Sequence, residues 1–267
     1  MTSRLPDNRR VHSPPTTEAS WCASVQPPQL AADEVHVWRV VLDDLATGGR
    51  PAAGVLSPTE REQAQRFHFD KDRRQYVVSH TALREILGGY LATDPACLRF
   101  ERSSRRKPEL APEFGPPQLR FNLSHTRGMA LIAVTLQRDV GVDVEFVHRV
   151  VEAEPIAERF FSPAENVQLR RLPAGQRQQA FFTCWTRREA YLKATGEGIA
   201  ESLDQLEVTF SPSEPARLVS VRGDRQAAAQ WQLEALSPGP DYVAALAVRG
   251  QGLKVRQWDW GHGGGLA

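Results

Sequence analysis

The chain has 267 residues, of which 41% are hydrophobic and 24% charged, and this ordinary globular composition leaves room for one large core or two smaller ones. Its net charge of +1 gives no overall field that would favour nucleic acid or a membrane surface as a partner. Three widely separated cysteines argue against a disulfide framework or a zinc site, and no apolar run suits a membrane span or a signal peptide, so we expect a cytoplasmic protein.

The first third of the chain predicts a leader, a strand and two helices. Residues 1–32 are rich in Pro, Ser, Thr and Gln without periodicity, which is typical of a disordered leader. Residues 34–42 alternate as a strand does. Ser57 and Glu60 have the spacing of a capping box at the start of a helix, and an apolar stripe predicts a second helix around residues 75–91.

Three short apolar runs follow in the middle of the chain, at residues 119–125, 129–136 and 140–147, and each predicts a strand. Only the polar residues 137–139 separate the second run from the third. We therefore expect these two strands to form a hairpin.

The remaining third predicts helices and then strands. Residues 150–172 have a helical pattern with a break near Ser162, and the stretch "FFTCWTRREAYLKATGEG" (Phe181–Gly198) predicts another helix. Later strands are expected at residues 203–210, 231–236 and 242–250. Strands and helices without strict alternation favour an α+β fold, in two halves that meet near residue 138.

Two carboxylates stand side by side in the strand "VGVDVEFV". Asp143 and Glu145 share one face, because alternate residues of a strand point the same way, while the valines face the other. Such a pair could hold a hard divalent cation. It could also be the solvent face of a half-exposed strand, and periodicity alone favours that second interpretation.

Glu189 is an unusual residue for its position in the predicted helix. Its spacing from Trp185 and Leu192 places it on the apolar side of the helix. One explanation is an exposed pair with Lys193 at the favourable i,i+4 spacing. The other is a buried carboxylate, which needs a cation or a proton, and a metal ion shared with Asp143 and Glu145 would meet that need.

A basic loop, "ERSSRRKPEL", and the segment "FNLSHT" offer groups for phosphate binding. The loop contains Arg102 and Lys107 and is either a phosphate clamp or an ordinary solvated loop. Ser124 and His125 follow a strand and could donate hydrogen bonds to a phosphate, although a lone histidine at a strand end is more often structural. The familiar P-loop, dinucleotide-binding, zinc-protease and α/β-hydrolase fingerprints are absent from the sequence.

Together these stretches resemble the 4′-phosphopantetheinyl transferases, specifically the large monomeric type that activates nonribosomal peptide and polyketide synthases. The resemblance is carried by "GVDVE" (Gly141–Glu145) and, about forty residues later, by "WTRREAYLK" (Trp185–Lys193), which match the family's G-(I/V)-D-(I/V)-E and W-x-x-K-E-A-x-x-K patterns. The stretches "LSPTEREQAQRF", "RRKPEL", "FNLSH" and "RFFSPAE" also match in order. The resemblance covers roughly residues 34–250.

The resemblance implies a fold and an activity. The fold would be α+β, with two similar halves related by a pseudo-twofold and coenzyme A bound in the cleft between them. The segments would be a disordered leader (1–32), an N-terminal half (33–138), a C-terminal half with the metal site (139–256) and a flexible tail (257–267). The enzyme would be a Mg²⁺-dependent monomer that moves the phosphopantetheine arm of coenzyme A onto a serine of an apo acyl or peptidyl carrier protein and releases adenosine 3′,5′-bisphosphate.

The resemblance also implies roles for individual residues. Mg²⁺ would be bound by Asp143, Glu145 and Glu189 together with the pyrophosphate of coenzyme A. Glu165 would assist deprotonation of the carrier serine. Coenzyme A would be held by Lys71, Arg102, Lys107, Ser124, His125, Asp143 and Lys193, with Lys193 at the pyrophosphate. Arg188 stands where the family pattern has lysine, which keeps the charge but changes its geometry.

Two other functions compete with the transferase. A non-catalytic coenzyme A or carrier-protein binding module would be marked by loss of a metal carboxylate or of Lys193, and all four residues are present. An unrelated Mg²⁺-dependent phosphoryl or nucleotidyl transferase would explain the acids and the basic loop, and stabilisation by ATP but not by coenzyme A would favour it.

Overall fold

The computed structural model describes residues 21–24, 26–43, 54–114, 119–148, 152–197, 203–211 and 214–261. Most of the predicted leader therefore lies outside the described residues. No helix within these ranges is both long enough and apolar enough to cross a membrane.

The first half of the chain forms an antiparallel sheet with one long helix against it. Ser57 begins the first helix as predicted, since its side chain accepts from the Glu60 N–H while the Glu60 carboxylate accepts from the Ser57 N–H. The second helix begins at Asp70, five residues before the predicted start. The elements are β2 (Glu34–Val41), α1 (Pro58–Gln65), α2 (Asp70–Leu91), β3 (Phe100–Arg102), β4 (Pro108–Leu110), β5 (Leu119–Thr126) and β6 (Met129–Leu136).

The second half repeats this pattern, with a pair of short helices inserted between its first strand and its long helix. The predicted break near Ser162 is confirmed, because Ser162 caps a new helix there. The elements are β7 (Val140–Phe146), α3 (Ala153–Phe160), α4 (Pro163–Arg171), α5 (Ala174–Thr195), β8 (Leu206–Val208), β9 (Leu218–Val221), α7 (Arg225–Ala229), β10 (Trp231–Leu236) and β11 (Tyr242–Arg249).

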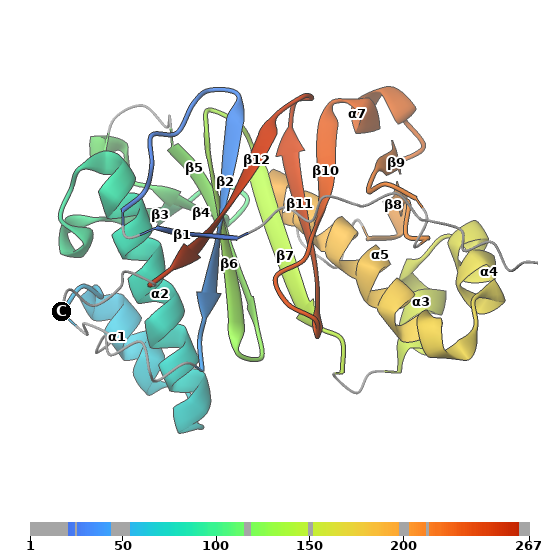
Figure 1. Cartoon of the computed structure of the whole chain (residues 1–267), viewed down its shortest axis with the longest axis horizontal. Coiled ribbons are helices and arrows are strands. Elements are labelled where there is room, and N and C mark those ends of the chain that lie inside the picture. The colour runs from blue at the N-terminus through green and yellow to red at the C-terminus, as the bar shows by residue number, and fades with distance from the viewer. Residues whose placement is uncertain are drawn as a thin grey trace, which may run out of the picture.

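Each half has the same topology. A strand (β2 or β7) is followed by a 22-residue helix (α2 or α5), a small two-stranded sheet (β3–β4 or β8–β9) and a hairpin (β5–β6 or β10–β11). The strand orders also correspond, since β2-β6-β5 in one sheet matches β7-β11-β10 in the other. Figure 1 shows the two sheets side by side, with α2 covering one and α5 covering the other. The predicted α+β class is confirmed.

The hairpin predicted for residues 129–147 is wrong. The strand β6 pairs with β5 on one edge and with β2 on the other, so neither edge is free for β7. The hairpin is instead β5–β6, which turns tightly at Gly128 with φ of +75°, a conformation that glycine adopts without strain. β7 crosses to the second sheet and pairs antiparallel with β11.

Two strands lie in segments predicted to be disordered or flexible. Residues Cys22–Ser24 form β1, and residues Lys254–Trp260 form β12. The strand β12 runs parallel between β1 and β2 and gives the first sheet the order β1-β12-β2-β6-β5. The predictions of a leader through residue 32 and a tail from residue 257 are therefore wrong for residues 22–24 and 257–260, because β1 pairs with β12 and β12 pairs with β2.

Three apolar clusters hold the layers together. One lies between α2 and the first sheet, one between the two sheets, and one between the second sheet and α5. The valines of β7 enter the middle cluster, so Gly141, Asp143 and Glu145 face α5. A Cβ on Gly141 would lie 2.1 Å from the carbonyl oxygen of Ala190, which shows how closely β7 approaches this helix.

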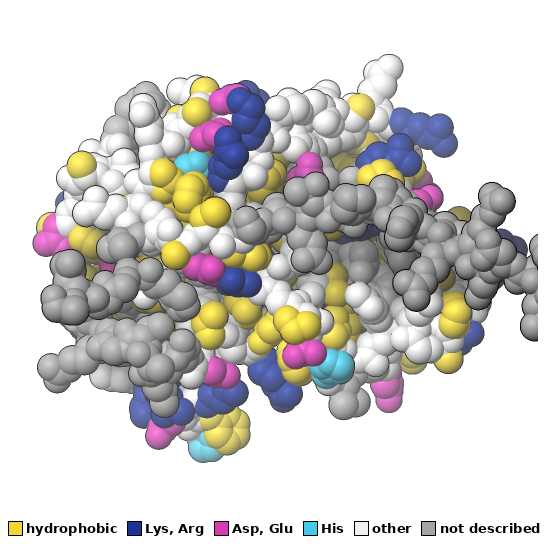
Figure 2. Space-filling view, in the orientation of Figure 1, with side chains coloured by type: hydrophobic (Ala, Val, Ile, Leu, Met, Phe, Trp, Pro, Cys, Tyr) yellow, Lys and Arg dark blue, Asp and Glu magenta, His cyan; other side chains and the backbone are white. Residues whose placement is uncertain are grey.

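The surface carries charges of both signs. Acidic and basic side chains are interspersed over the described part of the face shown in Figure 2. This agrees with the net charge of +1 and places any anion recognition in a local site.

Candidate active site at the junction of the two sheets

The carboxylates of β7 face a row of hydroxyl groups on β5. The Ser124 hydroxyl donates to Asp143 Oδ1 over 2.9 Å, and the Thr126 hydroxyl donates to Glu145 Oε2 over 3.4 Å. The Asn122 side chain continues this row by accepting from the Val142 N–H over 2.8 Å. The edge strands of the two sheets are thereby joined side by side, although they do not form a ladder.

Asp143 and Glu189 are both buried. Asp143 is 4% exposed and Glu189 is 3% exposed, which excludes a solvent-facing strand for the first and an exposed pair with Lys193 for the second. Within the described part of the chain, one oxygen of each, Asp143 Oδ2 and Glu189 Oε1, is buried without a hydrogen-bond partner. Buried carboxylate oxygens cost free energy unless something satisfies them, so these two atoms suit a ligand that brings positive charge.

The electrostatics of Glu189 reflect the same arrangement. Burial and the nearby carboxylates of Asp143 and Glu145 raise the pKa of Glu189 to about 7, while Lys193 opposes this rise. Two acids on β7 and one on α5 therefore act on one another although they lie more than forty residues apart in the sequence.

Lys193 supplies the positive charge of the site. Its ammonium donates to Asp143 Oδ1 over 2.6 Å and to Ser124 Oγ over 2.8 Å. His125 lines the same cavity, and part of its ring is exposed. The surrounding protein atoms and the Lys193 ammonium both disfavour a second positive charge, so the pKa of His125 is lowered.

The donor set fits a hard cation. Asp143 and Glu189 provide buried oxygens without partners, and Glu145 provides a third carboxylate close enough to raise the pKa of Glu189. No group of three or more His, Cys, Asp or Glu side chains in the described ranges already has the spacing of a metal site. Lys193 forms an ion pair with Asp143, so its ammonium offsets part of the negative charge that a metal ion would otherwise offset.

A cavity of about 300 Å³ opens beside these groups. Its lining combines polar and charged side chains with aromatic and aliphatic ones. Its lining residues are Ser124, His125, Asp143, Val144, Glu145, Ile156, Phe181, Phe182, Trp185, Glu189 and Lys193. The structure thus brings together six of the ten residues predicted for the site.

Three predicted phosphate contacts lie outside this cavity. Lys71 pairs with Asp43 at 3.1 Å, and Arg102 donates to the carbonyl of Arg106 within its own loop. Lys107 donates to two backbone carbonyls, as described below. In this structure none of the three points its charge at the carboxylates.

Glu165 is not among the residues that line the cavity, and its role as an aid to serine deprotonation stays a prediction. Its carboxylate accepts from the Ser162 N–H, from the Val208 N–H and from the guanidinium of Arg188. Arg188 is fully buried and also donates to the carbonyls of Phe160 and Leu206. The pair joins α4, α5 and β8, and this accounts for a basic residue at the position of Arg188.

The sequence did not single out Thr126, Asn122 or the apolar lining of the cavity. Thr126 follows Ser124 by two residues, so the period of a strand already placed both hydroxyls on one face. No local signal reveals that this face meets β7, since the two strands belong to different sheets.

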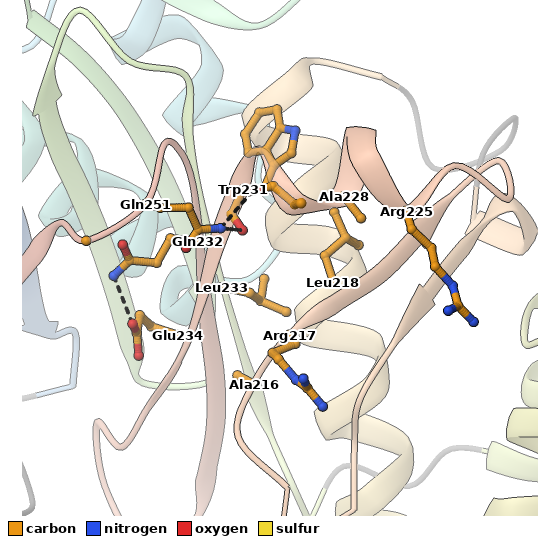
Figure 3. A pocket seen from close by; sticks show the side chains of 12 residues that line it. Ala216, Arg217, Leu218, Arg225, Ala228, Trp231, Gln232, Leu233, Glu234 and Gln251 are labelled. Carbon is orange, nitrogen blue, oxygen red and sulfur yellow. Dashed lines mark hydrogen bonds between the residues drawn. The ribbon is translucent and has the colours of Figure 1, made fainter.

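A second hollow, of about 520 Å³, is lined by residues of β9, α7 and the edge strand β10. Figure 3 shows Arg217 and Arg225 extending away from the glutamines of this hollow. Gln232 donates to Glu234, and Gln251 donates to two backbone carbonyls, so these polar groups satisfy one another. None of the predicted site residues lines it.

Comparison with known proteins gives matches over both halves. The family model of the 4′-phosphopantetheinyl transferase superfamily matches residues 139–247, and a model described as "4′-phosphopantetheinyl transferase, N-terminal" matches residues 48–137. The 4′-phosphopantetheinyl transferase HetI of Nostoc sp. is 42% identical over 88% of this chain and 97% of its own length. The 4′-phosphopantetheinyl transferase psf-1 of Bacillus pumilus is 32% identical, over 73% and 79%.

A solved structure is also similar to part of the chain. The holo-[acyl-carrier-protein] synthase of Thermotoga maritima is 24% identical over 44% of this chain and 64% of its own, with a TM-score of 0.33. A TM-score this low adds nothing to the account of the fold.

Proposed function

Because the chain belongs to the 4′-phosphopantetheinyl transferase superfamily and is an enzyme of that kind, we propose a specific reaction for it. It transfers the 4′-phosphopantetheine arm of coenzyme A to a serine of an apo acyl or peptidyl carrier protein. The serine oxygen forms a bond to the phosphorus of the arm as the phosphoanhydride P–O bond breaks. Adenosine 3′,5′-bisphosphate leaves, and the serine loses its proton.

One observation supports this proposal above the others. Three acids, a lysine and a serine from β5, β7 and α5 converge on one cavity, and two buried carboxylate oxygens there have no partner among the described residues. Such a site suits a polyphosphate that arrives with a cation, because each would satisfy groups that the protein alone leaves unsatisfied.

Mg²⁺ is the cation that the donor set favours. It would be held by Asp143, Glu145 and Glu189, and when bound it would neutralise charge on the pyrophosphate. Lys193 lies one helical turn beyond Glu189 and donates from the same side, so its ammonium would bind the phosphate oxygens and stabilise the charge of the leaving bisphosphate.

The remaining groups position the reactants. Ser124 and His125 line the cavity and would donate to the nucleotide phosphates. The carrier serine is the nucleophile, so no covalent enzyme intermediate is needed. Its proton would pass to water or to a basic group at the cavity, whose lining includes His125 and the three acids.

The division into halves is part of the same proposal. The family-model matches end at residue 137 and resume at residue 139, and this supports a boundary near residue 138 between the two topologically equivalent units. Coenzyme A would then bind at their junction, where β5 and β7 meet.

Incubation with coenzyme A, Mg²⁺ and a panel of apo carrier proteins tests the activity. We expect at least one carrier to gain the mass of the phosphopantetheine arm on its serine. If no carrier in a varied panel is modified while a known transferase modifies them all, the proposed activity is contradicted.

A phosphoryl transferase that uses ATP is the second candidate, since the acids and Lys193 would also serve it. Thermal unfolding separates the two. Stabilisation by coenzyme A with Mg²⁺ supports the transferase, whereas stabilisation by ATP alone supports the alternative.

A further inference from the structure

The loop between β3 and β4 reaches from the first half of the molecule to the end of α5. The Lys107 ammonium donates to the carbonyl of Val140 over 2.8 Å and to the carbonyl of Ala194 over 2.9 Å. The first carbonyl belongs to β7, and the second belongs to the last turn of α5. A single side chain therefore joins the strand that bears Asp143 to the helix that bears Glu189.

These two carbonyls need a partner. The last carbonyls of a helix have no N–H group within the helix from which to accept a hydrogen bond. A cation is favoured there because the helix dipole is negative at that end. The helix ends at Gly196, which is left-handed with φ of +74°, and the Cβ atoms of the loop pack close to it. Lys107 is half-buried, and this burial lowers the pKa of its ammonium to about 8.

The contact lies next to the closest approach of strand and helix. A Cβ on Gly141 would lie 2.4 Å from the amide nitrogen of Ala194, the residue whose carbonyl accepts from Lys107. A shift of the last turn of α5 away from β7 would therefore change the separation between the strand carboxylates and the Glu189 carboxylate of the helix.

We propose that Lys107 is a positioning residue, whose ammonium fixes the C-terminal turn of α5 against β7 and so sets the spacing of Asp143 and Glu145 relative to Glu189 and Lys193. This inference rests on the proposed function. The resemblance implies a contact between Lys107 and coenzyme A, whereas in this structure the ammonium donates to two backbone carbonyls.

The test compares K107M with R105M. Arg105 lies in the same loop and donates to the carbonyl of Thr195, but its side chain is 59% exposed, so R105M removes an equal charge without removing the buried bridge. Mn²⁺ binding to the coenzyme A-free protein, followed by electron paramagnetic resonance, measures the affinity of the carboxylate site for a cation without any need for turnover.

We expect K107M to weaken Mn²⁺ binding by about tenfold or more, the usual effect of losing a group that orients metal ligands, while R105M stays within about twofold. In steady-state assays kcat should fall in K107M while KM for coenzyme A changes by less than about threefold. A direct phosphate contact predicts the reverse, a raised KM with normal Mn²⁺ binding, and that result overturns the proposal.

K107Q serves if K107M does not fold, because the amide keeps an N–H donor for one carbonyl and has no charge. The proposal predicts that K107Q binds Mn²⁺ more weakly than wild type, by less than tenfold. Wild-type Mn²⁺ binding with weakened coenzyme A binding again overturns it. Failure of the wild-type protein to bind Mn²⁺ contradicts the metal site itself, whereas normal wild-type binding with no effect in either Lys107 variant contradicts only the positioning role.

Discussion

Glu189 is the residue on which the site depends most. A carboxylate that is 3% exposed and faces two other acids is unfavourable by itself, so its position makes sense only with a proton or a cation beside it. The Lys193 ammonium offsets the charge of Asp143 through an ion pair. A bound cation would offset the negative charge that remains on Glu189.

The first prediction concerns Asp143 and Glu189. D143N and E189Q should each lower kcat/KM for carrier modification by about a hundredfold or more, because each removes a charged ligand from the site. Circular dichroism should show an unchanged fold, since the variants keep the side-chain shape. Turnover near the wild-type rate in either variant would show that the acid does not bind the cation.

The second prediction concerns pH in the metal-free protein. In the unfolded chain the Glu189 carboxyl titrates near 4.5, whereas in the folded protein its pKa is about 7. Between these values the folded state keeps a proton that the unfolded state loses, so the free energy of unfolding falls as pH rises. Relative to E189Q, which does not titrate, we expect wild type to lose on the order of 2–3 kcal/mol between pH 4.5 and 7.5.

Urea unfolding in the presence of EDTA measures this difference at each pH. The same window should govern metal binding, because a carboxylate must lose its proton before it can ligate. Stabilisation by Mg²⁺ should therefore grow from pH 6 to pH 8 in wild type and stay small in E189Q. A pH-independent difference between the two proteins argues against a perturbed Glu189.

Motifs in the sequence identified the residues that meet at the site, since Asp143, Glu145, Glu189 and Lys193 lie in two short recognisable stretches. They did not identify what each side chain touches. Lys107 and Glu165 are in matching stretches too, yet one bridges backbone carbonyls and the other caps a helix beside Arg188. Those contacts depend on which elements pack together, and no local pattern states this.

At the scale of elements, the site is made by one strand and one helix held unusually close. Gly141 permits this approach, because any side chain there would meet the backbone of α5 at 2.1 Å. The helix contributes both Glu189 and Lys193 from its last two turns, so its distance from β7 decides the geometry of the whole cluster.

The third prediction follows from this contact. G141A should destabilise the protein by about 1–3 kcal/mol, since helix and strand must separate to admit a methyl group. It should also weaken Mn²⁺ binding. G175A is the matched control, because Gly175 lies in the first turn of the same helix with nothing within 4 Å of its added Cβ. Equal stability of G141A and G175A would contradict the close approach.

Periodicity predicted the long elements better than their partners. The apolar run at residues 129–136 correctly predicts the strand β6. It does not identify β5 as the hairpin partner, because a short polar turn separates β6 from both β5 and β7. The strands β1, β4 and β9 have only 3 or 4 residues, too few for an alternation to be recognised. In β12 the spacing of Trp258 and Trp260 carried a strand signal that the neighbouring glycines concealed.

At the scale of the whole molecule, the two halves share an order of elements rather than a visible sequence repeat. The same arrangement of strand, long helix, small sheet and hairpin occurs twice, and each half contributes one edge strand to the site. The repeat is invisible in the sequence because topology depends on which faces are apolar, and many residues satisfy that requirement.

The fourth prediction concerns the closing strand. Deletion of residues 254–267 removes β12, which covers one edge of β2 and carries the Asp259 carboxylate that accepts twice from Arg39. We expect loss of cooperative unfolding and aggregation, because an exposed strand edge pairs with other chains. Deletion of residues 262–267 alone keeps β12 entire and is the control. Cooperative unfolding of the longer deletion near the wild-type temperature would show that β12 is dispensable.

The central claim is that this junction of two sheets transfers the phosphopantetheine arm with a cation held by its three acids. Mass spectrometry of an apo carrier protein, incubated with the enzyme and coenzyme A, tests it most directly when Mg²⁺ is present, removed by EDTA, or restored. The account predicts full conversion with Mg²⁺, none with EDTA and recovery when Mg²⁺ is returned. Conversion at the same rate in EDTA, or by E189Q at the wild-type rate, would contradict it.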